Sequence, residues 1–222
     1  MKNIFRGIIA VLLVAAGLFV SNGVAQAERV QIYDGNVNDI LNDIREKNDF
    51  IKNHSDELRK RIKNYNEFEN LDLTIRGTHY FTGTDGFRYC ESYFGDSDKN
   101  RLIFQVNNDG SVSSAWIISP VHTLAGEKNE KGAAISGMLL GSIFNVIGLS
   151  DSESDNIMDN YKHSLENFNT KIAEQKFDEA RSIFNKTFSV WCTKSKRYIN
   201  LNVSADESTE PWLCRYFITA HT

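Results

Sequence analysis

Apolar residues recur at helical spacing in the segment that follows residue 36. Val37, Ile40, Leu41 and Ile44 fall on one stripe of a 3.6-residue helix, and charged residues occupy the other positions. Apolar residues at positions 58, 62, 65 and 68 continue this spacing. The pattern therefore predicts one long helix or two shorter helices over residues 37–68.

The pattern then changes to the alternation of half-buried strands. In 87–94, Cys90 and Phe94 share one face of a strand, while Tyr89 and Glu91 share the other. Asn, Asp and Gly tolerate positive φ, so the run Asn-Asn-Asp-Gly at 107–110 predicts a hairpin turn. We expect Pro120 to end the last strand. The strands predicted in this half are 30–33, 71–75 with 77–81, 87–94, 101–106 and 112–119.

Residues 132–150 contain no charged residue, and three interpretations of this run are open. It is a buried central helix, a face that binds lipid or a partner, or a membrane span at the lower limit of length. Polar residues and glycines interrupt the run, which disfavours the span. Gly137 and Gly141 would let another element approach this helix closely.

A second charged helical region is predicted from residue 150 to about residue 186. Ser150 and Glu153 have the spacing of a capping box, in which the glutamate reaches back to the first residue of the helix. Ile157, Tyr161 and Leu165 form its apolar stripe. Three strands then follow at 189–193, 197–203 and 212–219.

This order of elements predicts an α+β fold in which helices pack on antiparallel β-meanders. Residues 28–128 and 129–222 each run from helices to a meander, so we expect two similar lobes in tandem or a single mixed domain. In the tandem interpretation Tyr89-Cys90 matches Trp191-Cys192, and 116–119 matches 216–219.

Residues 1–27 have the three parts of a secretory signal peptide. Lys2 and Arg6 form a basic start, residues 8–20 are apolar and uncharged, and Ala25-Gln-Ala27 is a small-x-small cleavage site. An uncleaved anchor is the alternative, although the run is short for a bilayer. We expect cleavage near Ala27 and a secreted or periplasmic protein of bacterial type, without a transmembrane span in the mature chain.

Charge and motif spacing narrow the range of functions. The formal net charge is −4 for the whole chain and becomes −6 without Lys2 and Arg6, which argues against a nucleic-acid binder. No His-x-x-x-His pair, Cys-x-x-Cys pair or phosphate-binding glycine loop is present, so the sequence indicates no metal and no cofactor.

The three cysteines admit one disulfide and one free thiol. Cys192 and Cys214 lie in strand-like segments, and we expect neighbouring strands to bring them together as a disulfide in an oxidising compartment. Cys90 would then be free, and in an alternating strand it is expected to be a buried apolar residue. The alternative is a nucleophile activated by His79 or His122.

The sequence thus favours a secreted, non-catalytic binding module for a protein or cell-envelope partner. A carrier of an apolar ligand or lipid, with residues 132–149 lining its site, is one alternative, and a cysteine-dependent hydrolase is another. No motif identifies the ligand-binding residues. Tyr80, Phe81, Tyr93 and Trp212 would line a sugar or peptide site if they are exposed.

Overall fold

The computed structural model describes most of the chain beyond the predicted signal peptide, which lies outside the described residues together with part of the predicted 37–68 helix. The described residues are 30–61, 72–95, 97–122, 130–176, 178–179, 182, 186–206 and 212–222. In chain order the elements are β1 (Tyr33–Asn36), α2 (Val37–Asn53), α3 (Ser55–Arg61), β2 (Ile75–Thr82), β3 (Arg88–Phe94), β4 (Arg101–Val106), β5 (Ser111–His122), α4 (Glu130–Ile147), α5 (Asp151–Ala173), β6 (Lys186–Cys192), β7 (Arg197–Asp206) and β8 (Trp212–His221).

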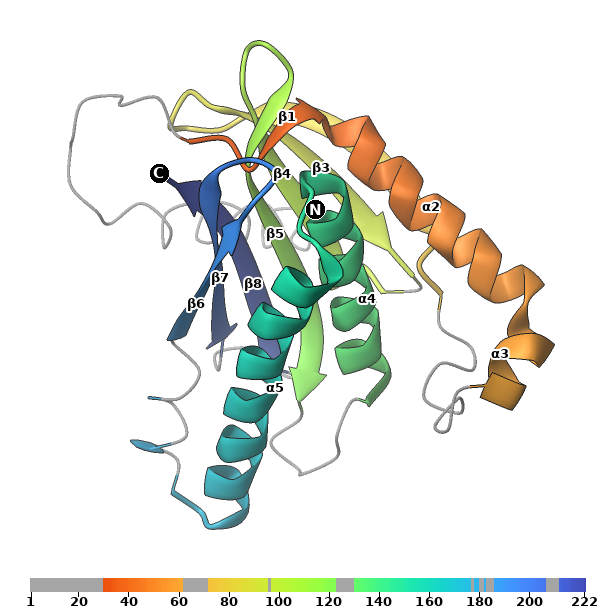
Figure 1. Ribbon diagram of the computed structural model, residues 1–222, viewed down its shortest axis with the longest axis vertical. Helices are drawn as coiled ribbons and strands as arrows, with labels where there is room; N and C mark the ends of the chain where they lie inside the picture. The colour runs from red at the N-terminus through yellow and green to blue at the C-terminus, as the bar shows by residue number, and fades with distance from the viewer. Residues whose placement is uncertain are drawn as a thin grey trace, which may run out of the picture.

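The described strands form one antiparallel sheet of eight strands, and the predicted α+β class is confirmed. The order across the sheet is β2-β3-β4-β5-β8-β7-β6, with β1 pairing to β5 beside this path. The meanders predicted for the two halves of the chain therefore meet where β5 pairs with β8 (Figure 1). Both predicted lobes contribute to a single sheet.

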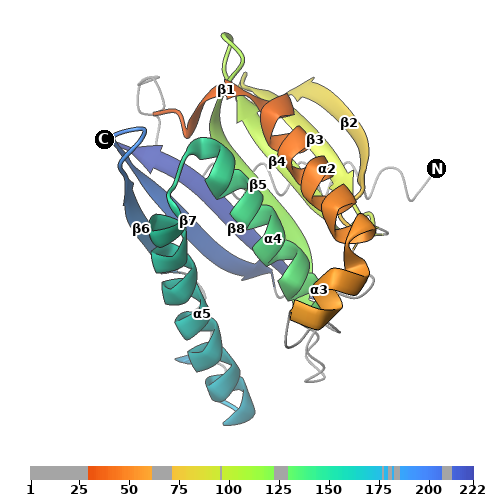
Figure 2. The same ribbon diagram turned by 45° about the vertical axis from the view of Figure 1, so that its right-hand side comes forward.

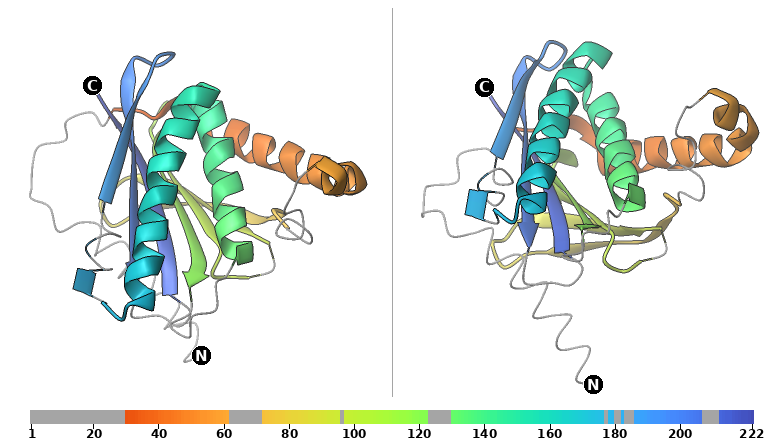
Figure 3. Two further views of the ribbon diagram at one scale, coloured as in Figure 1. Left: turned by 60° about the horizontal axis from the view of Figure 1, so that its bottom comes forward. Right: turned by 90° about the horizontal axis from the view of Figure 1, so that it is seen from below.

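The helices α2, α4 and α5 lie on the same face of this sheet, as the turned views show (Figures 2 and 3). They bury the apolar side chains that the strands direct toward them, and removal of this apolar surface from water is the main favourable contribution to folding. Fully buried members of this core include Ile40, Ile44, Phe104, Phe144 and Tyr216.

The uncharged run in the second half forms α4, which lies between α2 and α5 (Figure 2). Leu139, Leu140 and Phe144 are fully buried in the core, so the prediction of a buried central helix is confirmed. None of the described helices is long and apolar enough to span a bilayer. The expected close approach at Gly137 and Gly141 is wrong, because no described atom from another element lies within 4 Å of a Cβ built at either position.

Side-chain caps define where two of these helices begin. At α5, the Ser150 backbone N–H donates to Glu153 Oε2 over 2.8 Å and the Glu153 N–H donates to Ser150 Oγ over 3.4 Å, so the predicted capping box is confirmed. At α2, Asn36 and Asp39 form a second capping box that the sequence analysis did not identify. Each cap satisfies backbone donors that a helix start leaves unpaired.

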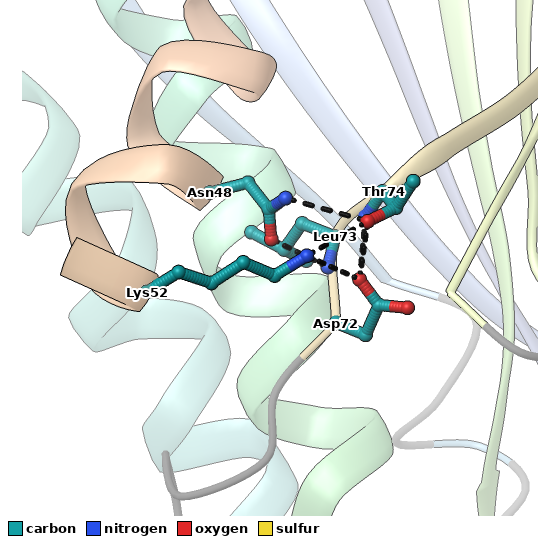
Figure 4. Close-up of polar contacts among 5 residues, drawn as sticks. All are labelled: Asn48, Lys52, Asp72, Leu73 and Thr74. Atoms are coloured by element: carbon teal, nitrogen blue, oxygen red, sulfur yellow. Dashed lines mark hydrogen bonds and ion pairs between the residues drawn. The ribbon is translucent and has the colours of Figure 1, made fainter. Parts of the chain in front are cut away.

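A polar cluster fastens the second half of α2 to the start of β2 (Figure 4). The side chain of Asn48 is buried, and its Oδ1 accepts from the Leu73 backbone N–H over 3.0 Å. Lys52 Nζ donates to Asp72 Oδ1 over 3.2 Å and to Thr74 Oγ1 over 3.0 Å. The cluster fixes the angle at which α2 crosses the sheet, and we assign it a structural role.

Two further expectations about the strands are wrong. Pro120 does not end β5, which continues to His122. Strand β4 pairs with β5 only as far as Ile118. Beyond Ile118, the edge of β5 that faces β4 makes no hydrogen bonds to that strand, so a proline, which lacks the backbone N–H, is tolerated at position 120.

The match of residues 116–119 with 216–219 is out of register by one residue. Tyr216 belongs to the helix-covered core, whereas Trp116 lies on the opposite face of the sheet. Equivalent residues of two lobes would occupy the same face, because successive side chains alternate across a strand. Cys90 and Cys192, by contrast, both belong to the core, as that match requires.

The open space beside the α4 glycines predicts a stabilised variant. We expect Gly137→Ala and Gly141→Ala each to raise the free energy of unfolding by roughly 1 kcal/mol, because alanine restricts the unfolded chain and meets no neighbour here. For a chain of this size that corresponds to an increase in Tm of about 2–4 °C in a thermal melt.

Gly148 provides the matched control for these substitutions. It has φ of 92°, and a Cβ there would collide with the Lys194 side chain. Gly148→Ala should therefore lower Tm. Equal effects of all three substitutions would contradict the packing described for α4.

Candidate functional site

The face of the sheet opposite α2, α4 and α5 is the candidate site, and we call it the open face. None of the described helices lies on it (Figure 3). Strand register aligns one side chain from each of seven strands in a row across it. The row consists of His79, Glu91, Ile103, Trp116, Phe217, Asn202 and Thr187.

Aromatic rings form a continuous ladder over the first part of the open face. Ring centroids lie 5.8 Å apart between His79 and Phe81, and 5.4 Å apart between Phe81 and Tyr89. The ladder continues from Tyr89 to Trp116 over 6.1 Å and from Trp116 to Phe217 over 4.6 Å. These distances are those of favourable aromatic pairs. The ladder therefore connects the edge strand β2 to the second half of the chain at β8.

A charged cluster lies at the β2–β4 end of the open face. The side chain of Glu91 is only 5% exposed, and its two oxygens lie 3.0 Å from His79 Nε2 and 3.5 Å from Arg101 Nη1. A buried carboxylate requires such partners, because its desolvation is otherwise costly. The His79 ring also stacks on Tyr93, at 6.4 Å between centroids.

Buried polar groups support the centre of the open face. Gln105 is fully buried, and its Oε1 accepts hydrogen bonds from Ser113 Oγ over 3.0 Å and from Ser114 Oγ over 3.2 Å. Trp116 is 6% exposed, and among the described residues its indole N–H has no hydrogen-bond partner. A buried donor without an acceptor is unfavourable by about 1–3 kcal/mol.

The β6–β7 end of the open face carries exposed aromatic rings. Trp191 and Tyr198 are 41% and 42% exposed and lie 5.0 Å apart between centroids. Tyr198 stacks in turn on His221, with centroids 5.1 Å apart and planes inclined by 13°. These three residues were not singled out as a site by the sequence pattern, because only the register of β6, β7 and β8 brings them together.

The structure does not assemble the predicted cysteine nucleophile. Cys90 is fully buried on the helix-covered face, whereas His79 pairs with Glu91 on the open face. Burial raises the pKa of the Cys90 thiol, which opposes thiolate formation. Across the sheet Cys90 pairs with Phe104, and Phe104 pairs with Ala115 of β5. His122 follows Ala115 by seven residues along β5, which is roughly 20 Å at about 3.3 Å per residue. The side chain of His122 lies outside the description.

The predicted disulfide between Cys192 and Cys214 is wrong, since all three cysteines are free and buried. Strand β7 separates β6 from β8, so the two thiols do not lie on neighbouring strands. On β7, Cys192 pairs with Arg197 and Cys214 pairs with Ala205. These two positions lie roughly 25 Å apart along the strand at about 3.3 Å per residue. A disulfide needs Cα atoms within about 7 Å.

Of the aromatic residues expected to line a site, two lie on the open face. Phe81 and Tyr93 are half-buried members of its ring contacts. Tyr80 is 44% exposed but lies opposite Cys90, where the Arg88 guanidinium covers its ring at 4.7 Å from the centroid. The side chain of Trp212 is outside the described part. Consecutive residues Tyr80 and Phe81 therefore belong to opposite faces.

Apart from the open face, a depression of about 580 Å³ lies between the α4–α5 turn and the β6–β7 turn. Its carboxylate, Glu153, accepts three hydrogen bonds: Oε2 accepts from the Ser150 N–H, and Oε1 accepts from the Thr193 N–H and hydroxyl over 2.9 and 2.6 Å. The depression is therefore a structural joint between α5 and the β6–β7 turn, and these hydrogen bonds hold its acid in place.

Comparison with known proteins identifies no relative: no protein family, no curated protein and no solved structure matches this chain. The argument for function therefore depends on the geometry of the open face. Like Trp191, Tyr198 and His221, the open-face residues Glu91, Gln105 and Trp116 were not singled out as functional by the sequence analysis. Their only signal in the sequence is that they fall on the side of each strand opposite the core residues.

The burial of the cysteines predicts their reactivity. We expect N-ethylmaleimide to leave the native protein unmodified and to add to Cys90, Cys192 and Cys214 after denaturation without any reductant. Intact mass spectrometry counts the adducts. Fast modification of Cys90 in the native protein, or a single adduct after denaturation, would contradict the described core.

The Glu153 joint predicts a pH-dependent contribution to stability. Hydrogen bonds from Thr193 and Ser150 lower the pKa of Glu153 from 4.5 to about 2. Because the pKa is lower in the folded state, the contribution is present above pH 4.5 and is lost as pH falls toward 2. Glu153→Gln should lower the free energy of unfolding by about 1 kcal/mol at pH 7, the usual size of a cap contribution, and by less at pH 3.

Urea unfolding at the two pH values measures this difference. Glu46→Gln removes an exposed carboxylate of α2 and is the matched control, with no pH-dependent loss expected. If Glu153→Gln lowered the free energy of unfolding by the same amount at both pH values, the stabilisation would not depend on the ionised carboxylate.

Proposed function

We propose that this protein is an exported, non-catalytic binding module whose open face binds a component of the cell envelope. The observation that carries the proposal is the aromatic ladder from His79 to Phe217, which crosses the sheet on the face that no described helix covers. Aromatic residues supply large contact areas with few rotatable bonds, and they dominate binding surfaces. Within the ladder Tyr89 and Trp116 are buried, so His79, Phe81 and Phe217 supply its accessible part.

Export is the part of the proposal that rests on the sequence. Lys2, Arg6 and the Ala25-Gln-Ala27 site have the pattern of a signal peptide, and the envelope is what an exported protein meets first. A secreted or periplasmic location is therefore proposed together with the partner.

The described residues favour binding over the two alternatives. The hydrolase interpretation needs an activated Cys90, and that thiol is buried with a raised pKa on the face away from His79. The carrier interpretation needs an apolar surface on α4, and the apolar side chains of α4 pack into the core. Neither alternative has an observation in its favour.

Co-sedimentation tests the proposal. The mature protein is mixed with the insoluble envelope fraction of the cells that produce it, and the bound fraction is measured. We expect Phe81→Ala and Tyr198→Ala, on the open face, to weaken binding by about tenfold or more, the usual result for an aromatic anchor. Tyr80→Ala, one residue from Phe81 but on the other face, and Phe50→Ala, on α2, should bind as the unmodified protein does.

Two outcomes would overturn the proposal. One is the absence of co-sedimentation, and the other is equal binding by all four variants. Treating the envelope fraction with a protease should leave binding intact. Loss of binding after that treatment would show that the open face binds a protein, and a protein partner would then take the place of the non-protein envelope component.

A further inference from the structure

The exposed rings at the β6–β7 end of the open face form a small platform. Only four large hydrophobic side chains in the described part of the chain are strongly exposed, and two of them, Trp191 and Tyr198, contact each other here. They are direct partners across β6 and β7, and His221 of β8 extends the stack. We call Trp191, Tyr198 and His221 the aromatic platform.

A hydrogen-bonded chain fixes the tautomer of His221. The Ser189 hydroxyl donates to Asn200 Oδ1 over 2.6 Å, so the amide nitrogen of Asn200 faces His221 Nδ1, 2.8 Å away. An amide nitrogen only donates, hence Nδ1 of the neutral ring accepts and Nε2 carries the proton. The exposed ring of His221 therefore offers an N–H donor beside the ring of Tyr198.

Along β6 and β7 the strand positions that extend from the aromatic platform are polar and uncharged, whereas the turn at its other side carries Lys194 and Lys196. The register places hydroxyl or amide side chains on the open-face positions between residues 187 and 189 and between residues 200 and 204. These neighbours are Thr187, Ser189, Asn200, Asn202 and Ser204. A charged ligand would find no counter-charge at these five positions, whereas a neutral ligand with many hydroxyl groups would find partners for them.

We propose that the aromatic platform binds a neutral saccharide. This inference rests on the proposed function and narrows its envelope component to an uncharged glycan. The apolar C–H face of a pyranose ring packs on Trp191 or Tyr198 and removes both surfaces from water. Its hydroxyl groups accept from His221 Nε2–H, and they exchange hydrogen bonds with the neighbouring hydroxyl and amide side chains.

Affinity electrophoresis tests the saccharide directly. The mature protein is run in native gels that contain hydroxyethyl cellulose, galactomannan or dextran, with alginate as the acidic comparison. We expect at least one neutral polymer, but not alginate, to retard the protein. Trp191→Ala and Tyr198→Ala should each weaken the apparent affinity by tenfold or more, and Tyr80→Ala, equally exposed on the other face, should leave it unchanged.

The saccharide proposal would be overturned if no neutral polymer retarded the protein. It would also be overturned if Trp191→Ala and the unmodified protein were retarded equally. Retardation by alginate alone would also overturn it. Thermal unfolding of each variant shows that the fold is intact, as expected for side chains that are more than a third exposed.

The co-sedimentation assay separates this failure from failure of the proposed function. If Phe81→Ala weakens envelope binding and Trp191→Ala does not, the open face binds its partner away from the aromatic platform. In that case only the saccharide proposal fails. If no open-face variant changes envelope binding, both proposals fall.

Discussion

The pairing of β5 with β8 is the interaction on which the rest of the structure depends. It joins the two meanders into one sheet, and it aligns Ile117 with Tyr216 on one face and Trp116 with Phe217 on the other. The first pair lies in the core beneath the helices, where the hydroxyl groups of Tyr161 in α5 and Tyr216 hydrogen-bond over 2.8 Å. The second pair is the last step of the aromatic ladder. The core and the open face thus depend on one antiparallel ladder.

Local features of the fold were predictable from the sequence, and pairings between distant segments were not. The bounds of β4 agree with the prediction, because alternation and the 107–110 turn are local signals. The Ser150–Glu153 cap is local too. The disulfide was mispredicted because no local signal shows that β7 lies between Cys192 and Cys214. Continuation of β5 through Pro120 depends on where a different strand, β4, starts.

The same distinction applies to the candidate site. Alternation alone places Glu91 on the face opposite Cys90, as the sequence indicates. Its pairing with His79 also needs the register of β2 and β3, which shifts between Arg76 and Thr78, where Gly77 has φ of 59°. The aromatic platform similarly requires the alignment of three strands. The resulting open face has the charged cluster of Glu91, His79 and Arg101 at one end and the aromatic platform at the other.

The alternation of faces across β5 and β8 also limits how this protein can change over evolution. A single residue inserted within β8 would shift every later side chain to the other face, sending Tyr216 out of the core and bringing Arg215 or Phe217 toward the helices. Substitutions can alter the open face one residue at a time, whereas changes of length are confined to turns such as 107–110 and 193–196. Related chains should therefore differ in length at their turns and keep the number of residues within the two central strands.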